Sequence, residues 1–332
     1  MLTILVTVTY GSRWNYLLQS LQSAFREGVD FAVVVNNASH DAISNLSALE
    51  FGKKVSVISL LSNTGSANGY NVGMKMAVAK GAQYILLLDD DNVLELGTLR
   101  VMRTAYSKAV RVTQSDNLII LGFRPDHQAD ISEKLLYNRV KTNPNSFFGF
   151  SVMDIPYKLF RRTFLFMHCS KKKVIPDQVK LDIGAYSGMY FHGSLLKKHG
   201  YPDPRIVLYG DDTEFSYRIT RAGGAIYLVV TAQLRDLEKS WNAHHLYSSS
   251  FKGWLFEEGD SRAYYSARNE AYFEQCIRPH NTLVRNLNKI FYMTVMKCYA
   301  LISGKMNRYR LITNAISDGE AKRLGMNIDH CL

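Results

Sequence analysis

The segment Tyr84–Asp91 constrains the fold of this 332-residue chain more than any other stretch. An aliphatic run, Ile85–Leu88, leads directly into Asp89, Asp90 and Asp91. A short apolar run bounded by polar residues predicts a buried strand of a parallel sheet, and such sheets bind ligands at the carboxyl ends of their strands. Because side chains alternate along a strand, an extended backbone would place Asp89 and Asp91 on one side and Asp90 on the other. Two carboxylates there suit Mg²⁺ or Mn²⁺ together with substrate phosphates.

The Asp triplet also fits a second interpretation. Asn92 and Glu95 form a capping-box pattern, and aspartates beside a helix start favour the helix dipole. Taken alone, the triplet is explained by a helix cap. The metal site is favoured only by features in the rest of the chain.

Composition and charge limit the class of protein. The hydrophobic content of 47% is enough for a full core, and the four cysteines are far apart with no CxxC pair. We therefore expect no disulfide scaffold or structural zinc, and a reducing, cytoplasmic compartment. The N-terminus lacks the features of a signal peptide, and no apolar run is long enough to span a bilayer. The net charge of +11 predicts an anionic partner: nucleic acid, a phosphorylated substrate or an anionic membrane.

Alternating patterns predict an α/β fold with a mostly parallel, doubly wound sheet flanked by helices. We expect strands over 2–9, 31–35, 55–60, 84–88, 118–123 and 225–230, and helices over 13–26, 194–199 and up to residue 80. The domains expected are 1–255, divided into a nucleotide-binding half (1–92) and an acceptor-binding half (93–255), and a C-terminal helical region over 256–332.

Two loops offer further candidates for a site. Residues 63–73 hold three glycines and three asparagines before a helix, which suits a pyrophosphate or an ordinary strand-to-helix loop. At residues 211–214, Asp211 would cap a helix with Glu214 at its third position, and Glu214 would pair with Arg218. Asp212 is then a spare carboxylate, and such a group in a cleft can serve as a general base.

Later segments extend the candidate site. The adjacent His244 and His245 offer one further metal ligand beside the two carboxylates. Residues 124–180 are basic and rich in aromatics, which indicates an acceptor-side or membrane-facing loop, or a solvated charge run. Arg262 and Arg268, at the start of a long helix, are available to phosphate.

The C-terminal region contains a basic amphipathic pattern. Its apolar positions recur at helical spacing among lysines and arginines: Leu283, Leu287, Phe291, Val295, Cys298 and Ile302. This helix could lie on an anionic membrane or pack against the catalytic domain, and the pattern favours neither.

In their order, six segments resemble glycosyltransferase family 2, most closely its bacterial rhamnosyltransferase and galactofuranosyltransferase branch. The segments cover most of residues 1–270: Thr7–Tyr10, Asn37–Asp41, Asn63–Gly73, Asp89–Asp91, Gly210–Phe215 and Arg262–Asn269.

The resemblance implies a GT-A fold and an inverting, metal-dependent reaction. It implies that Asp89 and Asp91 hold the metal with His244 or His245, and that Asp212 is the base. It also implies that the first strand and the turn after the second bind the nucleotide. One departure is that Asn36 and Asn37 stand where many relatives have Asp-Asn. The expected donor-binding residues are Thr9, Tyr10, Asn36, Asn37, Ser39, Asn63, Gly65, Asn71, Asp90, Arg262 and Arg268. The expected acceptor-binding residues are Ser187, Gly188, Asp211 and Glu214.

The sequence thus predicts a glycosyltransferase that moves galactofuranose or rhamnose from a UDP- or dTDP-linked donor to a cell-surface or lipid-linked glycan. It would sit at the inner face of the cytoplasmic membrane, held by the basic helix. The alternatives are a sugar nucleotidyltransferase, which would release pyrophosphate, and a basic nucleic-acid-binding protein. The nucleic-acid-binding alternative lacks a recognisable binding motif and leaves the two Asp clusters unexplained.

Overall fold

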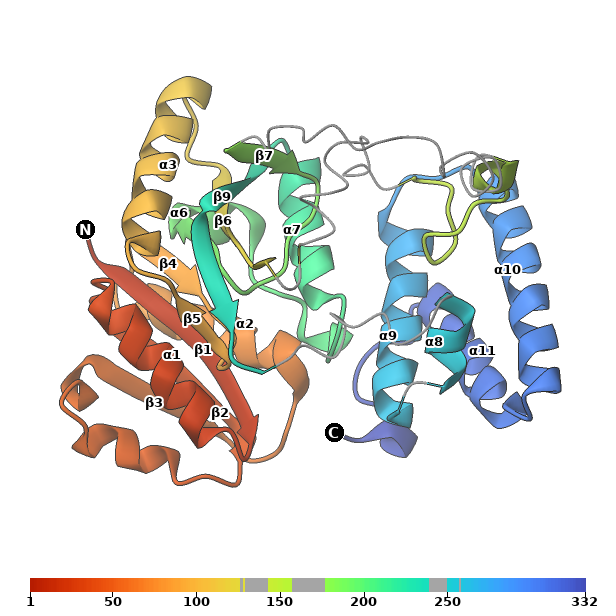
Figure 1. Ribbon diagram of the computed structural model, residues 1–332, viewed down its shortest axis with the longest axis horizontal. Coiled ribbons are helices and arrows are strands. Elements are labelled where there is room, and N and C mark those ends of the chain that lie inside the picture. Colours follow the sequence, from red (N-terminus) through yellow and green to blue (C-terminus); the bar gives the residue numbers. More distant parts are fainter. Residues whose placement is uncertain (126–127, 129–142, 157–176, 239–249, 257) are drawn as a thin grey trace, which may run out of the picture. The chain divides into compact units, whose positions relative to one another are not determined.

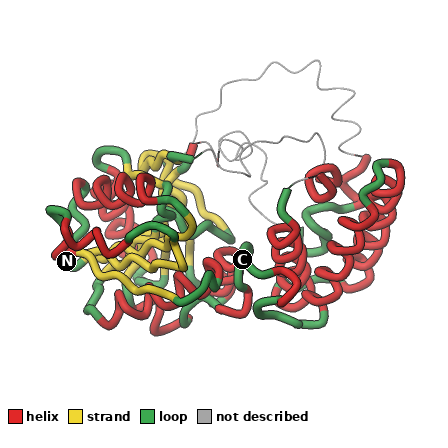
Figure 2. The backbone as a smooth tube through the Cα atoms, turned by 90° about the horizontal axis from the view of Figure 1, so that it is seen from below, coloured by secondary structure: helices red, strands yellow, loops and turns green. Residues whose placement is uncertain are grey.

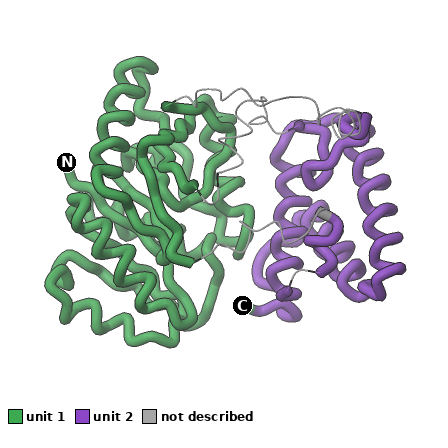
Figure 3. Tube along the Cα trace, in the orientation of Figure 1, with its two compact units in different colours: residues 1–135, 176–244, 332 green, residues 136–175, 245–331 purple. Residues whose placement is uncertain are grey.

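The computed structural model describes residues 1–125, 128, 143–156, 177–238, 250–256 and 258–332. Contacts divide the chain into two compact units (Figure 3). The sheet unit comprises residues 1–135, 176–244 and 332, and the helical unit comprises residues 136–175 and 245–331. Each unit is therefore built mainly from two long stretches of the chain, and the sheet unit also includes residue 332.

The described strands of the sheet unit form one sheet (Figure 2). It has nine strands, in the order β3-β2-β1-β4-β8-β6-β9-β5 with β7 beside β9. Apolar runs form its central strands, as their sequence predicts. The strands are β1 (Thr3–Gly11), β2 (Phe31–Ser39), β3 (Val55–Leu60), β4 (Tyr84–Leu87), β5 (Asn92–Leu94), β6 (Leu118–Phe123), β7 (Gln178–Leu181), β8 (Met189–His192) and β9 (Ala225–Asp236).

Strand direction changes in the middle of the sheet. Strands β3, β2, β1 and β4 are parallel, as are β6 and β9. Strand β8 lies antiparallel between β4 and β6, and β5 and β7 are antiparallel to β9. The α/β fold expected from the sequence is confirmed, whereas the direction of β8 could not be read from its short apolar run.

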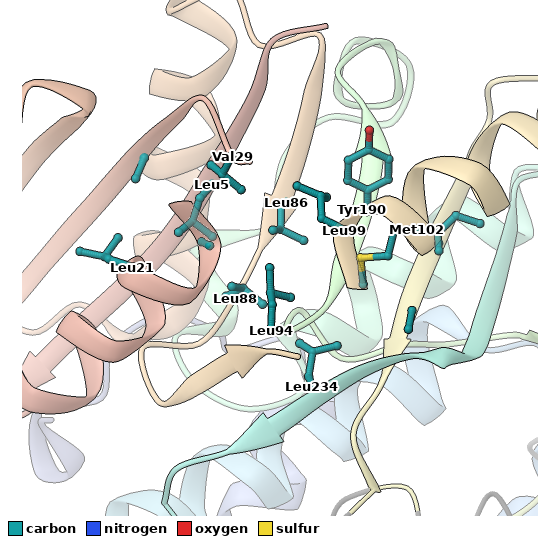
Figure 4. Packing of buried hydrophobic residues seen from close by; sticks show 14 of the residues in the cluster. Leu5, Leu21, Val29, Leu86, Leu88, Leu94, Leu99, Met102, Tyr190 and Leu234 are labelled. Atoms are coloured by element: carbon teal, nitrogen blue, oxygen red, sulfur yellow. The ribbon is translucent and has the colours of Figure 1, made fainter. Parts of the chain in front are cut away.

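Helices cover both faces of this sheet (Figure 1). Helices α1 (Trp14–Arg26) and α3 (Thr98–Thr113) bury Leu21, Leu99 and Met102 against Leu5 and Leu86 in the main apolar cluster (Figure 4). Helix α2 (Gly65–Ala79) lies on the opposite face, because it meets the alternate β1 side chains. The other named helices in the described part of this unit are α6 (Ser194–His199), α7 (Asp211–Arg221) and the short 3₁₀ turns Ile43–Ala48, Gly52–Lys54 and Pro204–Ile206.

The glycine-rich stretch 63–73 is mostly helix, which corrects its interpretation as a loop. Helix α2 begins at Gly65, so Gly69 and Gly73 lie within it. A Cβ atom on Gly69 would stand 2.7 Å from Val8 Cγ1, and one on Gly73 would stand 2.5 Å from Val6 Cγ1. These glycines therefore allow the helix to approach the sheet closely, and only the segment before Gly65 remains a loop.

Both capping alternatives are wrong. Asn92 begins strand β5 instead of a helix, and the next helix starts at Thr98 after Gly97. The cap of α7 is Gly210, whose backbone has φ of 76°, and Asp211 is the first helical residue. The expected Glu214–Arg218 pair is present, with Nε 2.7 Å from Oε1.

The helical unit contains α8 (Ser250–Phe256), α9 (Asp260–Tyr272), a π-helical turn (Phe273–Ile277), α10 (Thr282–Ile302) and α11 (Met306–Glu320), with 3₁₀ turns at Val152–Asp154 and Ile328–His330. The segment 143–156 packs into it: the Asn288 side chain binds Asn145 O and Val152 N, and Phe147 is fully buried. Among the described residues no helix is long and apolar enough to cross a membrane.

Candidate active site

The Asp triplet lies on a turn at the carboxyl end of β4. The strand ends at Leu87, and the Asn92 amide donates to the Asp89 carbonyl, so the backbone does not stay extended through the triplet. The Asp89 side chain is 41% exposed, whereas those of Asp91 and Asp90 are 17% and 4% exposed. Asp89 therefore offers the most accessible carboxylate of the three.

Asp89 is oriented from three sides. The Tyr70 hydroxyl, on α2, donates to Asp89 Oδ1 at 2.8 Å, and the Asp89 amide donates to Ser187 Oγ at 3.2 Å. Arg124, just after β6, places Nη1 3.7 Å from Asp89 Oδ2. Its guanidinium also binds Asp236 at the end of β9, with Nη2 2.5 Å from Oδ1. The ends of three strands thus meet at this carboxylate.

Arg13 holds the other two members of the triplet. This residue immediately precedes α1, and its Nε donates to both oxygens of Asp90 at 2.8 and 3.0 Å. Its other nitrogens lie 3.0 Å from Asp91 Oδ2 and 2.6 Å from Glu238 Oε2. Burial raises the pKa of Asp90 to about 7, although the ion pair with Arg13 lowers it.

A second pair of carboxylates begins helix α7. Asp211 is buried and accepts a hydrogen bond from Ser66 Oγ at 2.9 Å. Asp212 Oδ1 accepts one from the Thr213 amide at 2.7 Å. Burial raises the pKa of both groups; the Asp212 charge raises that of Asp211 further, and the Asp89 charge raises both. The two Asp motifs therefore lie close enough to repel each other, although about 120 residues separate them in the sequence.

The expected acceptor-binding residues lie beside these carboxylates. Glu214 is buried, and Arg218 holds it through Nε at 2.7 Å and Nη2 at 3.1 Å. Ser187 is buried and donates to Asn92 Oδ1. Gly188, with φ of 89°, donates its amide to Leu87 O. Their contact with an acceptor stays a prediction.

The ends of β1 and β2 provide the expected nucleotide-binding surface. Thr9 is buried and Tyr10 is 42% exposed, with the Arg13 guanidinium over its ring. Asn36 Oδ1 accepts a hydrogen bond from the Ser39 amide at 2.8 Å, and the Ser39 hydroxyl donates to Gly11 O. A hollow of about 670 Å³ lies beside this surface, lined by Ser12, Arg13, Trp14, Asn15, Tyr16, Asp41, Ala42 and Asn45.

Asn37 fixes the start of helix α2. Its Oδ1 accepts from the Thr64 amide at 2.9 Å, and its Nδ2 donates to Asn63 Oδ1 at 2.8 Å and to Gly65 O at 3.2 Å. The side chain is only 2% exposed. Asn71, also buried, donates to Pro202 O at 2.7 Å from the second turn of the helix. Direct contact of these amides with a donor stays a prediction.

The donor set around Asp89 and Asp91 fits a divalent cation. Burial and the neighbouring Asp89 charge together raise the pKa of Asp91 to about 6. Both ligands present hard carboxylate oxygens, and a cation between them would offset their repulsion. The described residues bring no three His, Cys, Asp or Glu side chains into one metal-binding group. Further ligands would come from substrate phosphates or from a residue outside the described part.

Four expected site residues are not among the described residues of the sheet unit. His244 and His245 lie outside the described residues. Arg262 and Arg268 are on α9 in the helical unit. Arg268 is 1% exposed, and it donates to Asn269 Oδ1 at 2.9 Å and to Gly325 O at 2.5 Å. Their contact with donor phosphate stays a prediction.

Sequence reasoning missed the two arginines that hold the triplet. Arg13 and Arg124 each follow a strand of the sheet at its carboxyl end, where ligands of α/β sheets bind. That position could have indicated them. Tyr70 gave no such signal because it lies inside helix α2. Asp236 gave none because it ends strand β9, which the sequence predicted to end six residues earlier.

Comparison with known proteins assigns the family. Residues 4–166 match the model of Glycosyl transferase family 2. No curated protein sequence matches the chain. The fold is similar to that of S. aureus TarS residues 1–349, whose structure was solved in complex with UDP-GlcNAc. The TM-score is 0.54 at 14% sequence identity, and the match covers 96% of this chain and 80% of that one.

A second similar structure is that of GalNAc-T7 with UDP, GalNAc and Mn²⁺. Its TM-score is 0.51 at 12% identity, and the match covers 92% of this chain but only 58% of that one. At such identities the likeness concerns the fold alone. The match assigns residues 4–166 to Glycosyl transferase family 2, and the chain has a fold similar to those of these two structures.

Proposed function

We propose that this enzyme is an inverting, metal-dependent glycosyltransferase that uses a nucleotide-diphosphate sugar. Its acceptor is a hydroxyl of a growing cell-surface polysaccharide or lipid-linked glycan, and galactofuranose and rhamnose are the leading sugars. The observation that carries the proposal is that helix α2 connects two carboxylate motifs, because its Tyr70 donates to Asp89 at 2.8 Å and its Ser66 donates to Asp211 at 2.9 Å. One motif suits the donor phosphates, and the other suits an acceptor hydroxyl.

Asp212 is suited to the role of base. The Thr213 amide fixes its Oδ1, while the described residues give its Oδ2 no hydrogen bond. In the proposed reaction the acceptor hydroxyl gives its proton to Asp212, and its oxygen forms a bond to the anomeric carbon. The bond from that carbon to the diphosphate breaks on the opposite side, so the nucleoside diphosphate leaves and the anomeric centre inverts.

The negative charge that develops on the leaving diphosphate needs compensation. Mn²⁺ or Mg²⁺ held by Asp89 and Asp91 would supply positive charge there. We expect Asn63 and Gly65, at the start of α2, to lie near the donor phosphates, with the Gly65 amide already held by Asn63 Oδ1 at 3.0 Å. The presence of UDP or UDP-GlcNAc in the two similar structures favours UDP over dTDP. A location at the inner face of the cytoplasmic membrane is part of this proposal.

Asp212→Asn tests the assignment of the base. The substitution keeps an oxygen for the Thr213 amide but removes proton acceptance, so we expect transfer to fall by on the order of 10²- to 10⁴-fold. Donor affinity should stay within a few-fold. The measurement is release of nucleoside diphosphate from a panel of UDP and dTDP sugars with Mn²⁺ and a glycan acceptor.

The exposed Glu50 provides a matched control, because Glu50→Gln removes one negative charge from the same unit without touching the site. Wild-type transfer by Asp212→Asn would show that another group is the base. Release of pyrophosphate instead of nucleoside diphosphate would replace the transferase with a nucleotidyltransferase.

A further inference from the structure

Helix α10 turns its apolar side outward. Its apolar stripe falls on one face: Leu283 is 77% exposed, Leu287 and Ile290 are each 64% exposed, and Ile302 is 88% exposed. Phe291, at 43%, and Leu301, at 59%, belong to the same stripe. Five of the six positions that the sequence marked as apolar are therefore exposed, and Val295 is half-buried.

The opposite face of α10 is anchored by polar pairs and by aromatic packing around Tyr292. Its buried residues are Arg285, Asn288, Tyr292, Met296 and Ala300. Arg285 pairs with Glu320 at 3.0 Å, and Asn288 binds the backbone of the segment 143–156. This orientation is fixed by specific hydrogen bonds, so the helix cannot rotate to bury its apolar stripe without breaking them.

The charged residues of α10 itself are all basic. From Cys276 to Ser317 the sequence has seven lysines and arginines and no aspartate or glutamate. Lys297 lies at the edge of the apolar stripe, and Lys297, Lys305 and Arg310 are exposed. This helix has an outward apolar face with cations near it, and its hydropathy is too low for it to span a membrane. Such a helix is suited to the interface of an anionic bilayer.

We infer that the outward face of α10 binds anionic lipid, with the helix lying in the plane of the membrane surface. The apolar side chains enter the boundary between headgroups and acyl chains, and the exposed lysines contact lipid phosphates. This inference identifies the protein surface that would account for the proposed membrane location. It does not depend on the sugar-transfer reaction. It can be tested without donor or acceptor.

Vesicle flotation of the full chain tests it, with phosphatidylcholine vesicles made with and without phosphatidylglycerol. We expect binding to the anionic vesicles and weakening by salt. The double variant Leu287→Glu/Ile290→Glu should lose on the order of tenfold or more in partitioning, because two apolar side chains leave the lipid. Leu96→Glu is the matched control, since Leu96 is 78% exposed but lies in the sheet unit.

Several results would overturn the inference. The wild-type chain could stay in the aqueous fraction with both kinds of vesicle, or the double variant could float as well as the wild type. A lower unfolding midpoint of the double variant, or a changed oligomeric state in solution, would show that protein covers this face instead of lipid.

Discussion

Arg13 links more of the candidate site than any one carboxylate. It contacts Asp90, Asp91 and Glu238 from a position just before α1, and its side chain is 13% exposed. Removal of one partner of a buried ion pair leaves an uncompensated buried charge, which costs more than the pair contributes. The residue therefore fixes the geometry of the triplet and keeps three negative charges compatible with the fold.

We expect Arg13→Met to destabilise the sheet unit by about 3 kcal/mol, because Asp90 would lose its partner while it stays buried. Urea unfolding measures the change. Arg205→Met is the control: Arg205 also pairs with an aspartate, but it is 68% exposed, so its loss should cost at most about 1 kcal/mol. Equal losses in both variants would contradict a special role for Arg13.

Helix α2 shows how an element can be misread from composition. Its glycines suggested a phosphate loop, yet Gly69 and Gly73 lie where a helix crosses β1 with no room for a side chain. Glycine permits loops and close helix–sheet contact alike, so composition alone does not distinguish them. The contact becomes visible only when the neighbouring strand is known.

Gly73→Ala should therefore destabilise the protein by about 1–3 kcal/mol, despite the better helix propensity of alanine. Its Cβ would stand 2.5 Å from Val6 Cγ1 and 3.0 Å from Val35 Cγ2. Gly253→Ala in α8 is the matched control, because a Cβ there meets nothing within 4 Å. Chemical unfolding should show opposite signs for the two variants; a stabilising Gly73→Ala would refute the packing argument.

The sequence predicted elements better than it predicted their surroundings. Strands β3 and β6 and helix α6 match their expected bounds, because short apolar runs and helical spacing are local signals. The antiparallel direction of β8 and the outward stripe of α10 were not predictable, since both depend on residues far away in the chain. Likewise both Asp motifs were found, whereas the ion pairs of Arg13 and Arg124 with these motifs depend on contacts between residues far apart in the chain.

At the scale of the whole molecule, raised carboxyl pKa values set the response to pH. Burial raises the pKa of Asp90 to about 7 and that of Asp91 to about 6, and it raises the pKa of Asp211 and Asp212 as well. In the helical unit, burial and Glu270 raise the pKa of Glu274 to about 8. The folded chain thus binds more protons than the unfolded chain between about pH 4 and pH 8.

Stability should therefore fall as pH rises from about 5 to about 8, because the folded state must then ionise buried carboxyls. Mn²⁺ should reverse part of the loss, most strongly at the higher pH, where its ligands are ionised. Urea midpoints with Mn²⁺ or with a chelator measure both effects. Stability that rises with pH in the presence of the chelator would contradict the raised pKa values.

Because each unit contains stretches that are far apart in the sequence, the order of synthesis on the ribosome limits when each unit can fold. Residues 143–156 emerge early, but the partner of the Phe148 amide, Glu274, is 126 residues further along the chain. Strand β9, which completes the sheet, is also made before helices α9 to α11. The sheet can therefore close during translation while this inserted segment waits for its helices. A chain that terminates after β9 would leave the apolar side of Phe147 without cover, and it would be a substrate for chaperones and proteases.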